Sequence, residues 1–127
     1  MNTILVADDD PFSLRLLEQV CSAGGYRVLT AHDGESALDV ASRRRPDLLL
    51  VDLEMPEMDG LSLIQALHTK PGTDHIRLVV MTPLGCRLDP AVMYSHRVSL
   101  CLVKPVKRTR LADALRNALT QPLTPPD

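Results

Sequence analysis

The sequence predicts a single α/β domain that is doubly wound, with helices on both faces of a five-stranded parallel sheet. Two observations carry this prediction: five short apolar runs recur along the 127 residues, and segments with helical spacing separate them. Strands that alternate with helices form a mostly parallel sheet, because right-handed crossovers place the helices over its two faces. A chain of this length is typical of one compact domain.

The five apolar runs are each four residues long and are bounded by polar or turn residues. Runs of this kind are typical of strands that are buried on both faces. The expected strands span residues 4–7, 28–31, 48–51, 78–81 and 100–103.

Helical spacing is clearest after the first and the fifth run. Asp10 followed by Pro11 fits a capped helix start, and Gly24 followed by Gly25 fits the end of the same helix. The helix after the fourth run, somewhere within residues 88–96, has the least regular pattern. The apolar positions that show the spacing are Leu14, Leu17 and Cys21 in the first helix and Leu111, Leu115 and Ala118 in the last.

The composition excludes two classes of partner. The net charge is −2, and the chain has one Phe, two Tyr and no Trp. Nucleic-acid binding is not expected, because the chain offers neither an overall attraction to phosphate backbones nor an aromatic surface on which bases could stack. No apolar run approaches the roughly 20 residues that cross a bilayer, and no signal-peptide pattern follows Met1. We therefore expect a cytoplasmic location and no contact of this domain with a membrane.

The cysteines and the C-terminal segment refine this picture. Cys21, Cys86 and Cys101 form an odd set without CxxC spacing, which favours small buried hydrophobes in a reducing compartment over a disulfide or a zinc site. The domain is expected to span residues 1–120. Residues 121–127, QPLTPPD, contain three prolines and are expected to form an extended tail or a linker stub.

Polar residues follow the apolar runs where the strands are expected to end. Asp8 and Asp9 follow the first run, Asp52 the third, Thr82 the fourth and Lys104 the fifth. In open α/β sheets the functional crevice lies beyond these carboxyl ends. Carboxylates that converge there repel one another by about 4 kcal/mol per close pair. Mg²⁺, which prefers oxygen ligands, and the lysine would neutralise them, and together with the hydroxyl they describe a site that binds a phosphoryl group.

Four motifs in this order, ILVADDDP, LLLVDLEMPEMDG, VVMT and VKPV, resemble the receiver domain of two-component response regulators over about residues 3–120. The resemblance implies a flavodoxin-like fold with strand order 2-1-3-4-5. It also implies a signalling domain rather than an enzyme, which accepts a phosphoryl group from a phosphohistidine of a histidine kinase or a histidine phosphotransfer domain. The stretch TPLGCR and the C-terminal segment are similar to receivers attached to hybrid sensor kinases, although a free-standing receiver stays open.

The resemblance implies a role for each matching residue. Asp52 would be the phosphoacceptor, and Thr82 and Lys104 would bind phosphoryl oxygens. The hydrophobic strand would fix Asp52 for in-line attack on phosphorus. Mg²⁺, or Mn²⁺ in its place, would be bound by Asp8, Asp9, Asp52 and the backbone carbonyl of Glu54.

Four further positions are expected to modulate this site. Receivers usually carry a small residue after the threonine, whose N–H donates to the phosphoryl group, whereas Pro83 has no N–H. Cys101 stands where the family commonly places an aromatic side chain that reports phosphorylation. Leu84 lies near the path of hydrolytic water in receivers, and its apolar side chain is expected to slow the loss of phosphate. Pro105 suggests a constrained turn that directs Lys104 inward, with a cis peptide bond as one alternative.

Other interpretations stay open. Receiver-fold interaction modules work without phosphorylation, and Pro83 and Cys101 favour this alternative, although such modules commonly lack one of the acidic or lysine positions. Phosphohydrolases of the haloacid dehalogenase type also use a strand-end aspartate and Mg²⁺, but their nucleophile follows the first strand and their larger fold with a cap domain does not fit this chain. A homodimer through the last helix also stays open, because an interface and a solvated face are both compatible with Lys107, Arg108, Arg110 and Arg116.

Overall fold

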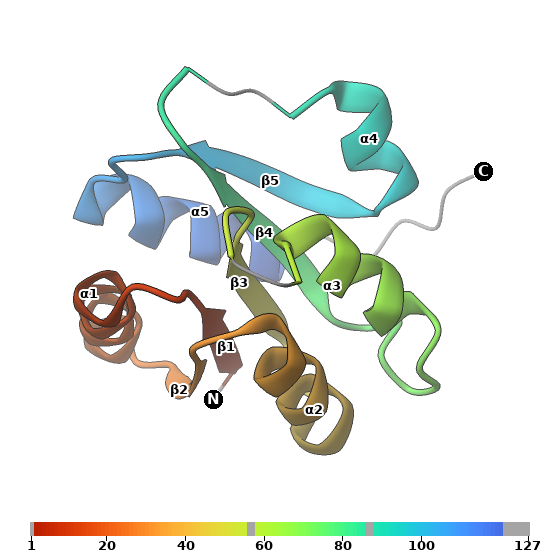
Figure 1. Ribbon diagram of the computed structural model, residues 1–127. Coiled ribbons are helices and arrows are strands. Elements are labelled where there is room, and N and C mark those ends of the chain that lie inside the picture. Colours follow the sequence, from red (N-terminus) through yellow and green to blue (C-terminus); the bar gives the residue numbers. More distant parts are fainter. Residues whose placement is uncertain (1, 56–57, 86–87, 121–127) are drawn as a thin grey trace.

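The computed structural model describes residues 2–55, 58–85 and 88–120 and confirms a single α/β domain built on a parallel sheet (Figure 1). The strands are β1 (Thr3–Ala7), β2 (Arg27–Ala31), β3 (Leu48–Asp52), β4 (Arg77–Thr82) and β5 (Val98–Val103). They lie in the order β2-β1-β3-β4-β5, and neighbouring strands are parallel throughout. This is the strand order expected for a flavodoxin-like fold.

Helices alternate with the strands along the described chain and cover both faces of the sheet (Figure 1). They are α1 (Pro11–Ala23), α2 (Gly34–Arg44), α3 (Gly60–His68), α4 (Pro90–Ser95) and α5 (Arg108–Thr120). Helices α1 and α5 pack on one face, and α2 and α3 pack on the other. The helix expected within residues 88–96 is confirmed as α4, but it has only 6 residues and none of its side chains is buried.

The central strand β3 supplies side chains to both hydrophobic cores in alternation. Leu48 and Leu50 pack with α1 and α5, whereas Leu49 and Val51 pack with α2 and α3. All five residues of β3 are buried, because helices cover its two faces and a strand lies on each side. Asp52, the last residue of β3, is therefore attached to the most enclosed element of the described fold.

The expectation that every strand is buried on both faces is wrong for β2 and β5. Arg27 and Thr30 of β2 and Val103 of β5 are exposed, because these strands lie at the two edges of the described sheet. The short helix α4 also leaves β5 incompletely covered. In addition, each strand is one or two residues longer than its apolar run, so that Asp52 and Thr82 end their strands rather than follow them.

Aspartate side chains fix where four of the helices begin. Each accepts a hydrogen bond from a backbone N–H of the first helical turn, at distances from 2.7 to 3.1 Å. Such caps satisfy N–H groups that have no partner within the helix. Gly24 and Gly25 end α1 as expected, and Gly25 has a φ of 89°, a conformation that favours glycine. The capping residues of α1 to α4 are Asp10, Asp33, Asp59 and Asp89.

The cysteines that the structure describes are free thiols, as expected. Cys21 is buried, and burial raises the pKa of its thiol to about 12, whereas Cys101 is only partly buried. Cys86 and the proline-rich segment 121–127 lie outside the described residues. Within the described residues, the helices lack the combination of length and apolar character that a membrane crossing requires.

We predict that Leu50→Ala lowers the free energy of unfolding by about 2 to 5 kcal/mol, because it leaves a cavity beside a fully enclosed strand. Urea denaturation of the parent and the variant measures this loss. Leu84→Ala is the matched control, since the Leu84 side chain is 79% exposed and its truncation is expected to change stability by no more than about 0.5 kcal/mol. Equal losses in the two variants would contradict the assignment of Leu50 to the core.

Candidate functional site

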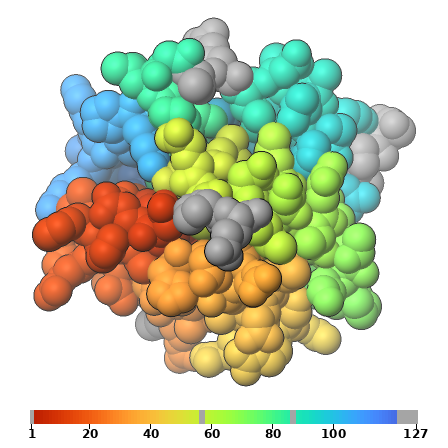
Figure 2. All heavy atoms as spheres, in the orientation of Figure 1, coloured from red at the N-terminus to blue at the C-terminus, as the bar shows by residue number. Residues whose placement is uncertain are grey.

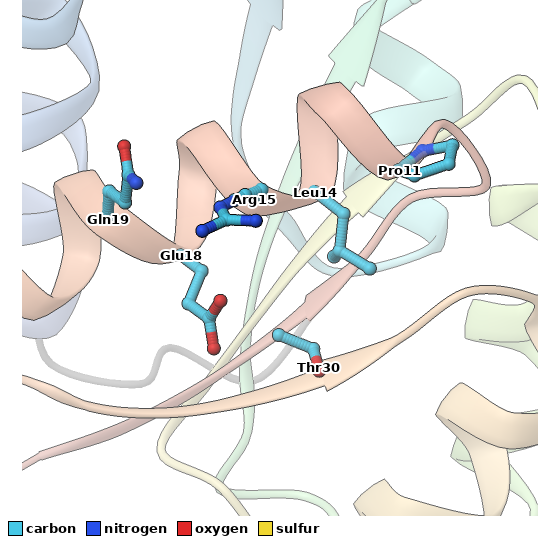
Figure 3. A pocket seen from close by; sticks show the side chains of 6 residues that line it. All are labelled: Pro11, Leu14, Arg15, Glu18, Gln19 and Thr30. Carbon is cyan, nitrogen blue, oxygen red and sulfur yellow. The ribbon is translucent and has the colours of Figure 1, made fainter.

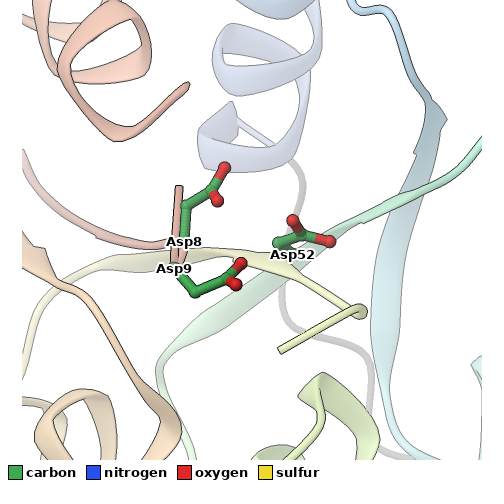
Figure 4. A group of neighbouring side chains, drawn as sticks. All are labelled: Asp8, Asp9 and Asp52. Carbon is green, nitrogen blue, oxygen red and sulfur yellow. The ribbon is translucent and has the colours of Figure 1, made fainter. Parts of the chain in front are cut away.

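Three carboxyl groups gather at the carboxyl ends of the neighbouring strands β1 and β3 (Figure 4). One oxygen from each of Asp8, Asp9 and Asp52 lies within 4.8 Å of the others. Asp8 and Asp52 are buried, whereas Asp9 is exposed. The parallel pairing of Ala7 with Val51 brings these residues together, because it places the ends of the two strands side by side.

Asp52 has a partner for each of its carboxylate oxygens. The Lys104 ammonium group forms an ion pair and hydrogen bond with Oδ2, and the backbone N–H of Glu54 donates to Oδ1 at 2.9 Å. The two contacts fix the orientation of the carboxylate. Lys104 thus points inward from the end of β5, and the peptide bond between Lys104 and Pro105 is cis.

The pairing with Asp52 also stabilises the charged form of Lys104. Partial burial by itself lowers the pKa of the ammonium group, but the hydrogen bond with Asp52 and the negative charges of Asp52 and Asp8 outweigh it and raise the pKa above the usual 10.5. Because the folded state binds this proton more tightly than the unfolded chain, the pair stabilises the fold at pH values below 10.5. This contribution is lost as the pH rises through the raised pKa.

Asp8 is less well compensated than Asp52. Its Oδ1 accepts a hydrogen bond from the Asp10 backbone N–H at 3.0 Å, whereas its buried Oδ2 has no hydrogen-bond partner among the described residues. Burial raises the pKa of Asp8, and the charge of Asp52 raises it further, although Ser13 and Lys104 act in the opposite direction. Ionisation of Asp8 therefore lowers the stability of the fold as the pH rises above the ordinary carboxyl value of 3.8.

Ser13 is a site residue that the sequence analysis missed. It lies near enough to Asp8 to lower the pKa of that carboxyl group and so to favour its ionised form, against the larger effect of burial. The signal was present in the sequence, because side chains in the first turn of a helix lean back toward its N-terminus, here toward the end of β1. A polar residue three positions after the capping Asp10 is therefore well placed to reach the strand end.

Thr82 ends β4, the strand next to β3, and its side chain is buried. Its backbone oxygen accepts a hydrogen bond from the Lys104 N–H at 2.8 Å, and its Oγ1 lies 3.9 Å from the Cys101 sulfur. Pro83 follows and is partly buried, whereas Leu84 is largely exposed. The structure thus brings Thr82 and Cys101 into contact, and it places Leu84 at the surface of the loop after β4.

A groove of about 370 Å³ lies between α1 and β2 (Figure 3). Its lining combines apolar and polar side chains of one helix face with one residue of an edge strand. Asp8, Asp9 and Asp52 do not line this groove. The candidate site is therefore the carboxylate cluster at the carboxyl ends of the strands, and not the groove. The lining residues are Pro11, Leu14, Arg15, Glu18, Gln19 and Thr30.

We predict that Asp8→Asn raises the free energy of unfolding of the metal-free protein at neutral pH by about 1 kcal/mol, because it removes a buried and incompletely paired charge. The asparagine retains an oxygen that can accept from the Asp10 N–H. Thermal and urea denaturation in the presence of a chelator measure the change. Asp9→Asn, at an exposed position, is expected to have a smaller effect, and a loss of stability in Asp8→Asn would contradict this account of the cluster.

Comparison with known proteins places these features in a family. The model of the response regulator receiver domain matches residues 4–116. The response regulator PleD from Caulobacter vibrioides is 40% identical over 114 residues, which cover 90% of this chain and 25% of PleD. The polar-differentiation response regulator DivK from Brucella anthropi is 25% identical over 117 residues, which cover 92% of this chain and 95% of DivK. The chain thus spans about a quarter of PleD and nearly all of DivK.

A solved structure extends the similarity to three dimensions. The receiver domain of the sensor histidine kinase PA1611 from Pseudomonas aeruginosa PAO1 superposes with a TM-score of 0.84 at 26% identity, over 94% of this chain and 98% of that one. That structure contains a magnesium ion coordinated in its active site cleft. On the match to the family model and the shared fold, the chain belongs to the response regulator receiver domains, a family of signalling domains in two-component systems.

Proposed function

We propose that this domain accepts a phosphoryl group from a phosphohistidine onto Asp52, with Mg²⁺ bound at the neighbouring carboxylates. The observation that supports this most directly is the juxtaposition of two kinds of group at Asp52. On one side lies a paired ammonium group, Lys104, and on the other lies Asp8, whose buried Oδ2 lacks a partner among the described residues. Such an arrangement fits a nucleophile beside a cation site.

The donor set fits Mg²⁺. The ligands would be Asp8, Asp9, Asp52 and the backbone carbonyl of Glu54, all of them hard oxygen donors of the kind that Mg²⁺ prefers, and Mn²⁺ accepts the same donors. The partnerless Oδ2 of Asp8 would gain a partner. When bound, the ion would neutralise charge on the carboxylates and on the phosphoryl oxygens.

The chemistry assigned to Asp52 is nucleophilic attack. A carboxylate oxygen forms a bond to phosphorus, while the bond between phosphorus and the donor histidine nitrogen breaks and the nitrogen takes the electron pair. The buried strand β3 and the Glu54 N–H orient the carboxylate for in-line attack. Lys104, which now contacts Asp52, would pair with a phosphoryl oxygen, and the Thr82 hydroxyl would donate to another. Water later releases phosphate, so the domain assists only its own phosphorylation and dephosphorylation.

We further propose a histidine kinase or a histidine phosphotransfer domain as the partner. PA1611, whose receiver domain is similar, is a sensor histidine kinase, whereas PleD and DivK are response regulators. Attachment to a hybrid kinase and a free-standing receiver therefore both stay open. Four further points stay predictions: the receiver boundaries at residues 1–120, the tail after them, the cytoplasmic location and a homodimer through α5.

Pro83, Leu84 and Cys101 are proposed to modify the behaviour of the phosphorylated state. Pro83 has no N–H for the phosphoryl group, which weakens its retention. Leu84 is exposed beside this position and would slow hydrolysis by excluding water. Cys101 contacts Thr82 directly, but a thiol is too small to transmit a threonine movement by an aromatic swing, so the signal would leave through different contacts. Pro105, after Lys104, would limit the movement of the loop that follows β5.

We predict that incubation with acetyl phosphate and Mg²⁺ adds the mass of one phosphoryl group to the parent protein, and that Asp52→Asn and metal chelation each abolish the gain. Asp39→Asn, at an exposed position of α2, is the matched control and retains it. Intact-mass spectrometry measures the change. A folded parent that gains no mass would favour the phosphorylation-independent interaction module, and repeated turnover of phosphate esters would favour the phosphohydrolase.

We predict that Pro83→Ala lengthens the lifetime of the phosphoryl group on Asp52 by about tenfold, because it restores a backbone donor to a charged acceptor. Decay of the phosphorylated protein, followed by mass spectrometry after removal of the phosphodonor, gives this lifetime. In the same assay, Leu84→Ser is expected to have a shorter phosphoryl lifetime than the parent. The lifetime of Cys101→Ala is expected to differ from that of the parent. A Pro83→Ala lifetime equal to that of the parent would exclude the missing donor as a determinant.

A further inference from the structure

Gly34, the first residue of α2, lies against the loop that connects β3 to α3. A Cβ atom at position 34 would lie 2.7 Å from the Met58 Cβ, 2.9 Å from its Cγ and 2.9 Å from its backbone oxygen. Favourable contacts between carbon atoms begin near 3.5 Å. A change of the Met58 rotamer cannot relieve the contact with the backbone oxygen. Any side chain at position 34 must therefore displace the loop or the start of α2.

The local backbone does not explain why glycine stands at this position. Position 34 is the first residue of a helix, and the Asp33 carboxylate already caps it through the Ser36 N–H at 2.7 Å. In a helix, glycine is less favourable than alanine by up to about 1 kcal/mol. The close approach of Met58 supplies the reason that the helix alone does not.

Both ends of this loop are attached to rigid elements. At its start, the Leu53 N–H donates to the Met81 oxygen of β4 at 3.0 Å. At its end, the Gly60 N–H donates to the Leu53 oxygen at 3.3 Å, and a Cβ on Gly60 would lie 2.9 Å from the Leu53 Cα. Glu54 and Met58 both lie between these two anchored points, so we expect a displacement of Met58 to reach Glu54.

Helices α2 and α3 are in contact, and the space-filling view shows α2, in orange, packed beside the yellow-green start of α3 (Figure 2). The α2 helix contributes none of the carboxylates of the site. Its first residue is nevertheless the surface on which part of the β3–α3 loop lies. Glu54 in the same loop donates to Asp52, so the position of the loop bears on the geometry around the phosphoacceptor.

We propose that Gly34 is a positioning residue: the absence of a side chain at the start of α2 lets the β3–α3 loop pack against the helix, and this contact sets the position of the Glu54 backbone beside Asp52. The consequence for metal binding rests on the proposed function, because it concerns the Glu54 carbonyl as a ligand. The displacement of the loop does not depend on that function. Mg²⁺ requires near-ideal octahedral geometry, so a ligand that shifts by a few tenths of an ångström weakens binding.

The test compares Gly34→Ala with Glu35→Ala, which adds the same residue type at the next, exposed position. In the metal-free protein, Gly34→Ala is expected to shift the backbone amide NMR signals of Leu53, Glu54 and Met58, and in a Mg²⁺ titration to weaken affinity by about threefold to tenfold. Glu35→Ala is expected to leave both unchanged. Met58→Gly in the Gly34→Ala background removes the clashes with the Met58 Cβ and Cγ, leaves the one with its backbone oxygen, and should restore affinity in part.

Unchanged loop signals in a folded Gly34→Ala protein would overturn the proposal, since they would mean that space exists for the side chain. If Gly34→Ala does not fold, the single variant Met58→Ala tests the proposal. It shortens the side chain that lies against Gly34 and introduces no clash. Faster hydrogen exchange of the Glu54 amide is expected in this variant. Unchanged exchange in that variant would equally overturn the proposal. A parent protein that binds no Mg²⁺ would refute the proposed function but leave the loop displacement to be judged from the metal-free spectra.

Discussion

The structure of this domain depends on how negative charge is accommodated at one edge of the sheet. Asp8, Asp9 and Asp52 have carboxylate oxygens within 4.8 Å of one another, and two of these groups are buried. At such separations, repulsion between a pair amounts to about 4 kcal/mol at an effective dielectric constant near 20. Lys104 compensates Asp52 directly, but Asp8 keeps a buried oxygen without a partner among the described residues. The fold thus carries a local electrostatic cost where its proposed chemistry would occur.

Rigid elements make this crowding tolerable. The residues of β3 are buried on both sides, so Asp52 cannot relax away from Asp8 without disturbing two hydrophobic cores. The loop beyond it is fixed at its base by hydrogen bonds of Leu53 with Met81 and Gly60 and lies against Gly34. The carboxylates therefore cannot move apart to reduce their repulsion. The same rigidity would preorganise them as ligands for a bound cation.

The other side of the site is less constrained. Helix α4 has no buried side chain, and the edge strand β5 is only partly covered. Thr82 contacts Cys101, and Pro83 has no N–H to donate. Asp52 is therefore held in an enclosed strand, whereas Cys101, beside Thr82, lies in an edge strand that is only partly covered.

The sequence by itself determined the alternation of strands and helices, the capping of α1 by Asp10 and the polar residues at the strand ends, because these follow from local periodicity and turn chemistry. The sequence could not reveal the exposure of β2 and β5, because a four-residue apolar run has the same pattern in a central strand and in an edge strand. Only the tertiary structure decided two features of the site. Among the described residues, Asp8, unlike Asp52, has a buried oxygen without a hydrogen-bond partner, and Gly34 lies against Met58. Both depend on strand register and on packing between segments that are distant in the sequence, which no local pattern encodes.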